Sequence, residues 1–264
     1  MARKSDFRFL GLSLLGIWAT ACGGQQPAVE ATTSALTTAN ALTANALTAN
    51  ALTANALTAN ALTANALTAN ALTANALTAN GLKDPLAREL MKYVVSCALP
   101  ADQTLSMSID GTSYSFPGGL GLAPQWGKRG GSCDQSCQRW VSGCVLARVD
   151  FLGVEELISE RGFTPALNTT WQELFGYPAI EATYYGNIFA DGQPMYVCLP
   201  PGKTEIPRVC GPSLDNCPMT VVGSCTKACA FQMPFVGGYV GCSSSGNARK
   251  PDVYPESVTV FLPR

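Results

Sequence analysis

Ten of the eleven cysteines fall within one stretch of the chain, between Cys97 and Cys242. Cysteines at this density are typical of domains that fold in an oxidising compartment and are held by disulfides. An even set can pair completely, but many pairings are possible, so the connectivity stays open. The disulfide candidates are Cys97, Cys133, Cys137, Cys144, Cys198, Cys210, Cys217, Cys225, Cys229 and Cys242. The eleventh cysteine, Cys22, needs a separate explanation.

The N-terminus supplies that explanation. A basic start precedes an uncharged, mostly apolar run from Phe9 to Ala21, which is shorter than the roughly 20 residues that span a bilayer. The run ends in Ala19-Thr20-Ala21-Cys22, which resembles the lipobox of bacterial lipoproteins, although Ala19 stands where that pattern usually has Leu. The resemblance implies that residues 1–21 are a signal peptide and that Cys22 is acylated. An ordinary signal peptide is the alternative. Gly23-Gly24 lacks the acidic residue that often holds such proteins at the inner membrane, which indicates the outer membrane.

Between the anchor and the cysteine-rich part lies a perfect tandem repeat. Ala-Leu-Thr-Ala-Asn occurs eight times from Ala41 to Asn80, after a degenerate copy at residues 35–40. In a helix, leucines five residues apart would wind around the axis and form no apolar face. A β-solenoid is similar in period to pentapeptide-repeat proteins, but the small and Asn positions differ. We therefore expect residues 22–34 to be a linker and residues 35–81 a tether, with partial helix or solenoid as alternatives.

The sequence of residues 82–264 predicts one disulfide-rich α+β domain with two main helices and an antiparallel sheet. A helix should begin at Asp84-Pro85, and a second should run from Ser132 to Val149. In the second helix three cysteines and Trp140 share one face, so we expect three disulfides to fix it to surrounding loops. A short helix is expected at residues 225–229. A hairpin over residues 105–116 and strands over 154–159, 181–189, 195–199 and 258–261 complete the pattern.

The composition excludes several kinds of chemistry. The chain has no histidine, which removes mechanisms with a histidine base. A formal net charge of −1 and the lack of a basic cluster argue against nucleic acid as a partner. We expect no cofactor and no metal; four thiolates from the 133/137 and 225/229 cysteine pairs are a weak zinc alternative. Carboxylate chemistry remains open, and its candidates are Glu155, Glu156, Glu160, Glu173, Glu181 and Asp191.

Aromatic residues near Gly and Pro suggest a binding surface. The candidates are Trp126, Trp171, Tyr177, Tyr184 and Tyr185. The sequence therefore favours an envelope lipoprotein, attached to the bilayer through Cys22, that displays a non-enzymatic binding domain for an envelope glycan or a surface protein. The alternative is a carboxylate-dependent hydrolase acting on envelope polysaccharide. Two facing carboxylates in a cleft would favour the enzyme.

Overall fold

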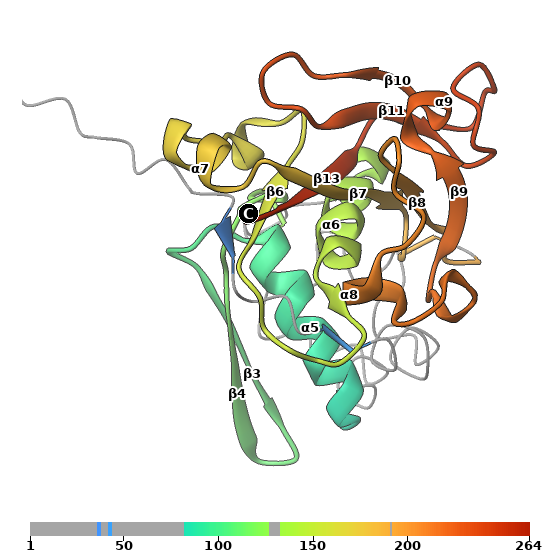
Figure 1. Cartoon of the computed structure of the whole chain (residues 1–264). Helices are drawn as coiled ribbons and strands as arrows, with labels where there is room; N and C mark the ends of the chain where they lie inside the picture. The colour runs from blue at the N-terminus through green and yellow to red at the C-terminus, as the bar shows by residue number, and fades with distance from the viewer. Residues whose placement is uncertain (1–35, 38–41, 44–81, 127–132, 191) are drawn as a thin grey trace, which may run out of the picture. The chain divides into compact units, whose positions relative to one another are not determined.

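A six-stranded sheet forms the centre of the domain in a computed structural model of the chain (Figure 1). The structure describes residues 36–37, 42–43, 82–126, 133–190 and 192–264. The predicted signal peptide, Cys22, the linker, most of the tether and Asp191 lie outside these residues. In spatial order the strands are β1 (Leu36–Thr37), β6 (Ile158–Arg161), β13 (Ser257–Leu262), β7 (Ala179–Gly186), β8 (Met195–Leu199) and β9 (Thr220–Ser224).

Neighbouring strands of this sheet are antiparallel except β8 and β9, which are parallel. Helix α6 (Gln135–Ala147) packs on β7 and β13, and helix α5 (Pro85–Ala98) packs on α6. Gly143 permits the close approach, since a Cβ there would lie 3.0 Å from the Val258 side chain. The predicted α+β class is therefore confirmed.

The helix start predicted at residue 84 and the hairpin turn predicted at residues 110–111 are both confirmed. The Asp84 carboxylate accepts the Leu86 backbone N–H at 2.9 Å, and Pro85 opens α5. Strands β3 (Thr104–Ile109) and β4 (Thr112–Pro117) form a hairpin. Its turn, Asp110-Gly111, has φ of 50° and 79°, as a type I′ turn requires.

Three predicted boundaries are wrong. Helix α6 is capped by Asp134 rather than Ser132. The strand expected over 154–159 begins only at Ile158, because the Asp150 carboxylate accepts the Leu152 and Val154 backbone N–H groups and folds residues 151–157 into a loop. Strand β7 ends at Gly186, where φ is 143°, and not at residue 189.

A second, three-stranded sheet follows near the C-terminus. It consists of β10 (Cys229–Gln232), β11 (Tyr239–Ser243) and β12 (Val253–Tyr254). Strand β2 (Leu42–Thr43) pairs in parallel with β5 (Val149–Asp150). The remaining short helices are η1 (Pro165–Leu167), α7 (Trp171–Gly176), α8 (Pro207–Cys210), η2 (Leu214–Asn216) and α9 (Cys225–Ala228). Among the described residues, no helix has the length and apolar character needed to cross a bilayer.

The ten cysteines form five disulfides, as predicted. The pairs are Cys97–Cys144, Cys133–Cys137, Cys198–Cys225, Cys210–Cys217 and Cys229–Cys242. The expectation that α6 is fixed to loops by three disulfides is wrong. Cys133 and Cys137 close the first turn of the helix on itself, and Cys144 joins α6 to α5 through Cys97. The two main helices are therefore covalently linked.

Candidate functional site

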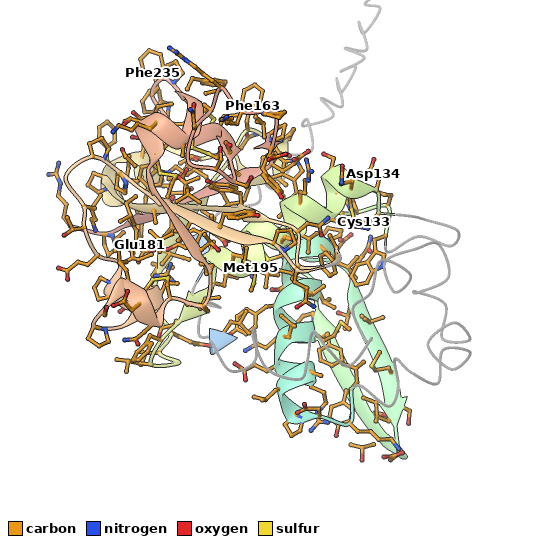
Figure 2. The ribbon with its side chains drawn as sticks, turned by 90° about the vertical axis from the view of Figure 1, so that its right-hand side faces the viewer. Cys133, Asp134, Phe163, Glu181, Met195 and Phe235 are labelled. Atoms are coloured by element: carbon orange, nitrogen blue, oxygen red, sulfur yellow. A yellow bond between two sulfur atoms is a disulfide. The ribbon has the colours of Figure 1, made fainter. Side chains whose placement is uncertain are left out.

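An apolar cleft opens between the segment that follows β6 and the turn that joins β10 to β11. Its volume is about 470 Å³, within the range of ligand pockets. The lining is Gly162, Phe163, Thr164, Pro165, Leu167, Asn168, Thr169, Phe231, Met233, Pro234 and Val236. We call it the aromatic cleft, because Phe163 and Phe231 line it; Phe235 lies in the chain between the lining residues Pro234 and Val236. Figure 2 shows Phe163 and Phe235 at the same end of the domain.

Residues 162–169 form the first wall. Gly162 lies so close to its neighbours that a Cβ would come within 2.7 Å of Leu167 Cδ1 and 2.9 Å of Trp140 Cζ3. This tight exit from β6 turns Phe163 outward, where 70% of it is exposed. The Thr169 hydroxyl is buried in this wall and has no hydrogen-bond partner among the described residues. Such a group is able to bind a polar atom of a ligand.

The second wall is the β10–β11 turn. Met233 N–H donates to Gly238 O at 2.7 Å, and Gly237 N–H donates back to Met233 O at 3.0 Å. These bonds hold Phe235 in the left-handed region, at φ 64°, with 94% of the residue exposed. A non-glycine residue costs about 1–2 kcal/mol in this conformation. An aromatic residue that is both strained and solvated stabilises nothing in the domain, so it is a candidate for contact with a partner.

Arg161 precedes the first wall in the chain and joins it to the second wall through its side chain. Its guanidinium donates to Val236 O at 3.0 Å in the β10–β11 turn and to Tyr177 O at 2.7 Å after α7. It also lies over the Phe261 ring, 3.7 Å from the centroid. Burial lowers the pKa of Arg161 to about 10, partly offset by Glu173, so the group stays charged at neutral pH. The cleft is therefore held by a charged group that makes several backbone contacts.

Helix α7 continues the aromatic character beside the first wall. Thr170 and Glu173 form a reciprocal capping box at its start. The buried Glu173 carboxylate also accepts the Ser159 hydroxyl at 2.6 Å. With Glu173 turned inward, Trp171 and Phe175 face solvent, 72% and 75% exposed, with ring centroids 6.2 Å apart.

The predicted binding aromatics divide into two groups. Trp171 is exposed and Tyr177 is half-buried beside the aromatic cleft. The prediction is wrong for Trp126, Tyr184 and Tyr185, which are core residues exposed by 4% or less.

The buried tyrosines have specific partners. The Tyr184 hydroxyl donates to Glu181 at 3.0 Å, and the Tyr185 hydroxyl donates to Ser243 O at 2.9 Å. Burial is the main reason that the pKa of both hydroxyls is raised. Sequence reasoning missed Phe163, Phe231 and Phe235, whose exposure depends on how two distant segments meet.

The candidate carboxylates do not form a facing pair in the described part of the chain. Glu160 is buried against Arg148, with 3.0 Å between Oε2 and Nη2. Glu181 is buried against Arg208, whose Nε lies 2.9 Å from Oε1. Glu155 and Glu156 are exposed in the loop before β6. No Asp or Glu lines the aromatic cleft. These buried carboxylates are bound by cations and hydroxyls, as structural ion pairs are.

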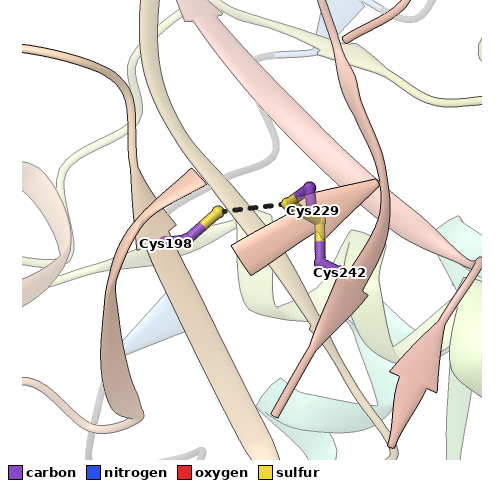
Figure 3. Close-up of side chains that lie close together, drawn as sticks. All are labelled: Cys198, Cys229 and Cys242. Atoms are coloured by element: carbon purple, nitrogen blue, oxygen red, sulfur yellow. Dashed lines mark hydrogen bonds between the residues drawn. A yellow bond between two sulfur atoms is a disulfide. The ribbon is translucent and has the colours of Figure 1, made fainter. Parts of the chain in front are cut away.

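Three cysteine sulfur atoms lie close together where β8 meets the three-stranded sheet of β10, β11 and β12. Cys198 Sγ is 3.6 Å from Cys229 Sγ, and Cys242 is close by (Figure 3). All three belong to the disulfides Cys198–Cys225 and Cys229–Cys242, so none offers a thiolate to a metal. The four cysteines of the zinc alternative, at positions 133, 137, 225 and 229, are likewise all bonded in disulfides. The cluster therefore joins β8, α9, β10 and β11 covalently.

Comparison with known proteins gives no family assignment. No family model matches the chain, and neither the curated proteins nor the solved structures contain a significant match.

Proposed function

We propose that this chain is an envelope lipoprotein, attached to the bilayer through Cys22, whose disulfide-held domain binds an apolar segment of a partner protein in the aromatic cleft. The observation that carries the proposal is Phe235, which lies in the chain between two lining residues of the cleft and is 94% exposed in a left-handed conformation. Exposed apolar surface rimmed by aromatics marks sites of protein association.

The lining favours a protein over a glycan. Among the described residues, the lining contains no charged side chain. Its apolar surface comes from Phe163, Leu167, Phe231, Met233 and Val236. Its polar side chains are three threonine and asparagine residues, of which the Thr169 hydroxyl has no partner in the described structure. A few polar groups in an apolar cleft suit a peptide that inserts an apolar side chain and presents its backbone nearby.

The N-terminal sequence supports a location in the cell envelope. The lipobox-like residues 19–22 imply an acylated N-terminus, and a pair of acyl chains holds a protein stably at a bilayer. The five disulfides suit an oxidising compartment outside the cytoplasm. Because Leu36 pairs with β6, the spacer between the anchor and the domain is the roughly 13 residues that follow Cys22, which as a coil would reach about 20 Å from the lipid surface.

Site-directed photo-crosslinking in intact cells tests the proposal. A photoreactive phenylalanine analogue replaces Phe163 or Phe231 in the cleft, and the matched control replaces Phe151, which is 40% exposed outside the cleft lining. We expect one discrete adduct from the cleft positions, removed by protease and absent from the control. An adduct removed by a muramidase but not by protease, or no adduct from either cleft position, would overturn the proposal.

A further inference from the structure

The first exact copy of the repeat is part of the domain. Leu42 and Thr43 form β2, which pairs in parallel with Val149 and Asp150 of β5 and lies beside α5 (Figure 1). The Leu42 backbone N–H donates to Arg148 O at 3.1 Å. The Leu42 side chain is fully buried in the main core. One leucine of the repeat therefore occupies a specific apolar site at a strand edge.

The receiving edge is fixed by the domain itself. Where α6 ends and β5 begins, Arg208 donates to Ala147 O at 2.9 Å and to Val149 O at 2.8 Å. The carbonyl between them, Arg148 O, is the one that accepts the Leu42 N–H of β2. The Arg148 side chain is in turn held by Glu160 and by Ser96 of α5. The edge is thus preorganised to accept an incoming strand.

Nothing in the sequence distinguishes the docked copy from the others. Residues 41–45 are identical to each later unit, up to residues 76–80. We propose that the β5 edge is a docking site for the repeat unit itself, and that any of the eight copies occupies it, so that the domain grips its own tether at alternative registers. The occupant is the Ala-Leu-Thr sequence of this same chain, with one leucine in the apolar site.

Loop closure sets the balance between registers. Four residues separate Thr37 of β1 from Leu42, whereas nine would separate it from Leu47. Lengthening this loop alone lowers the docking equilibrium constant by about threefold, and the loop on the other side, which ends at the buried Leu82, shortens by the same five residues and offsets part of that cost. Summed over the seven later copies, docking without the first copy should be only about twofold weaker than with all eight. A slip moves the grip by five residues along the tether.

Three variants of the full-length chain test the proposal. The first has Leu42→Ser alone. The second keeps Leu42 and changes the other seven repeat leucines to Ser, and the third changes all eight. The degenerate copy at Leu36–Thr37 is no competitor, because it is paired with β6. The measurement is amide hydrogen exchange in the peptide that covers Val149–Asp150, with α6 and β7 peptides in the same digest reporting whether the domain remains folded.

Leu42→Ser alone should lower protection at residues 149–150 by about twofold at most, and the seven-leucine variant should lower it by roughly a few-fold at most. Only the eightfold variant should expose residues 149–150 to the level of the Glu155–Glu156 loop, with α6 and β7 still protected. If Leu42→Ser alone exposes the edge as fully as the eightfold variant, the register is unique and the proposal is wrong. Full protection in the eightfold variant would show that the repeat does not cover this edge, and would also overturn it.

Discussion

Phe235 carries the functional proposal at the scale of a single residue. Its φ of 64° is unfavourable for a side chain with a Cβ, and its ring is almost wholly solvated. Phe235→Gly should therefore leave the free energy of unfolding within about 1 kcal/mol of the parent, because relief of backbone strain offsets the greater freedom of glycine in the unfolded chain. Urea unfolding measures this free energy.

The same substitution should reduce partner binding strongly. With the photoreactive residue at position 231, Phe235→Gly should abolish most of the adduct. The matched control is Leu152→Gly, which removes another exposed apolar side chain, 78% exposed, outside the lining of the aromatic cleft. If Phe235→Gly lowers stability by several kcal/mol, or leaves the adduct unchanged, then the ring acts in folding rather than in recognition.

The buried tyrosines predict how stability depends on pH. Burial raises the pKa of Tyr184 and of Tyr185 above the ordinary value of 10.0. The folded chain therefore binds more protons than the unfolded chain above pH 10, and stability must fall as pH rises, by about 1.4 kcal/mol per pH unit for each tyrosine. Arg161 works in the opposite direction between pH of about 10 and 12.5, because its pKa is lowered, but one group offsets only one of the two.

Urea midpoints measured from pH 8 to pH 11.5 check this dependence. Stability should be flat below pH 9 and fall above pH 10. In Tyr185→Phe the decline should be shallower, since one titrating hydroxyl is gone, although the contact with Ser243 O is lost at every pH. A profile that stays flat to pH 11.5 would contradict the burial of these two hydroxyls.

At the scale of elements, the disulfides differ in what they constrain. Cys97–Cys144 joins α5 to α6 across 47 residues, whereas Cys133–Cys137 spans four. Chain entropy predicts that Cys97→Ala with Cys144→Ala costs about 4 kcal/mol, and that Cys133→Ala with Cys137→Ala costs about 2. Thermal unfolding of the two double variants checks the order. Equal losses, or a larger loss from the short loop, would show that α6 is not held mainly through α5.

Local signals in the sequence were sufficient for the elements they control. Asp84-Pro85 and Asp110-Gly111 each act within a few residues, so the start of α5 and the β3–β4 turn were predictable. The parallel pairing of β8 with β9 and the partners of the cysteines depend on contacts far apart in the sequence, which a single chain does not reveal.

The candidate site was predicted less well, for the same reason. Trp171 was predicted because it lies in a segment near Gly and Pro, and it is exposed because α7 turns Glu173 inward. Phe163 and Phe231 line one cleft only because Arg161, the last residue of β6, donates to Val236 O in the β10–β11 turn. Tyr184 and Tyr185 have the same composition signals as a surface aromatic, and only the central sheet decides that they are buried.

At the scale of the whole molecule, the proposals describe an anchored domain with one recognition cleft and one grip on its tether. The cleft lies at the β10–β11 turn, and the grip lies at β5, where Leu42 docks. The repeat lies between β1 and Leu82, so its identical leucines keep the grip when the number of copies changes, while the residues from Cys22 to Leu36 separate the domain from the bilayer. The attachment to the bilayer depends on acylation of Cys22, which stays a prediction.

Intact mass of the protein extracted from membranes, with and without reduction and thiol alkylation, tests this central claim most directly. We expect a chain that begins at Cys22, carries diacylglycerol, and gains ten alkyl groups only after reduction, because the ten remaining cysteines form five disulfides. A chain without lipid, or thiols that react before reduction, would contradict it.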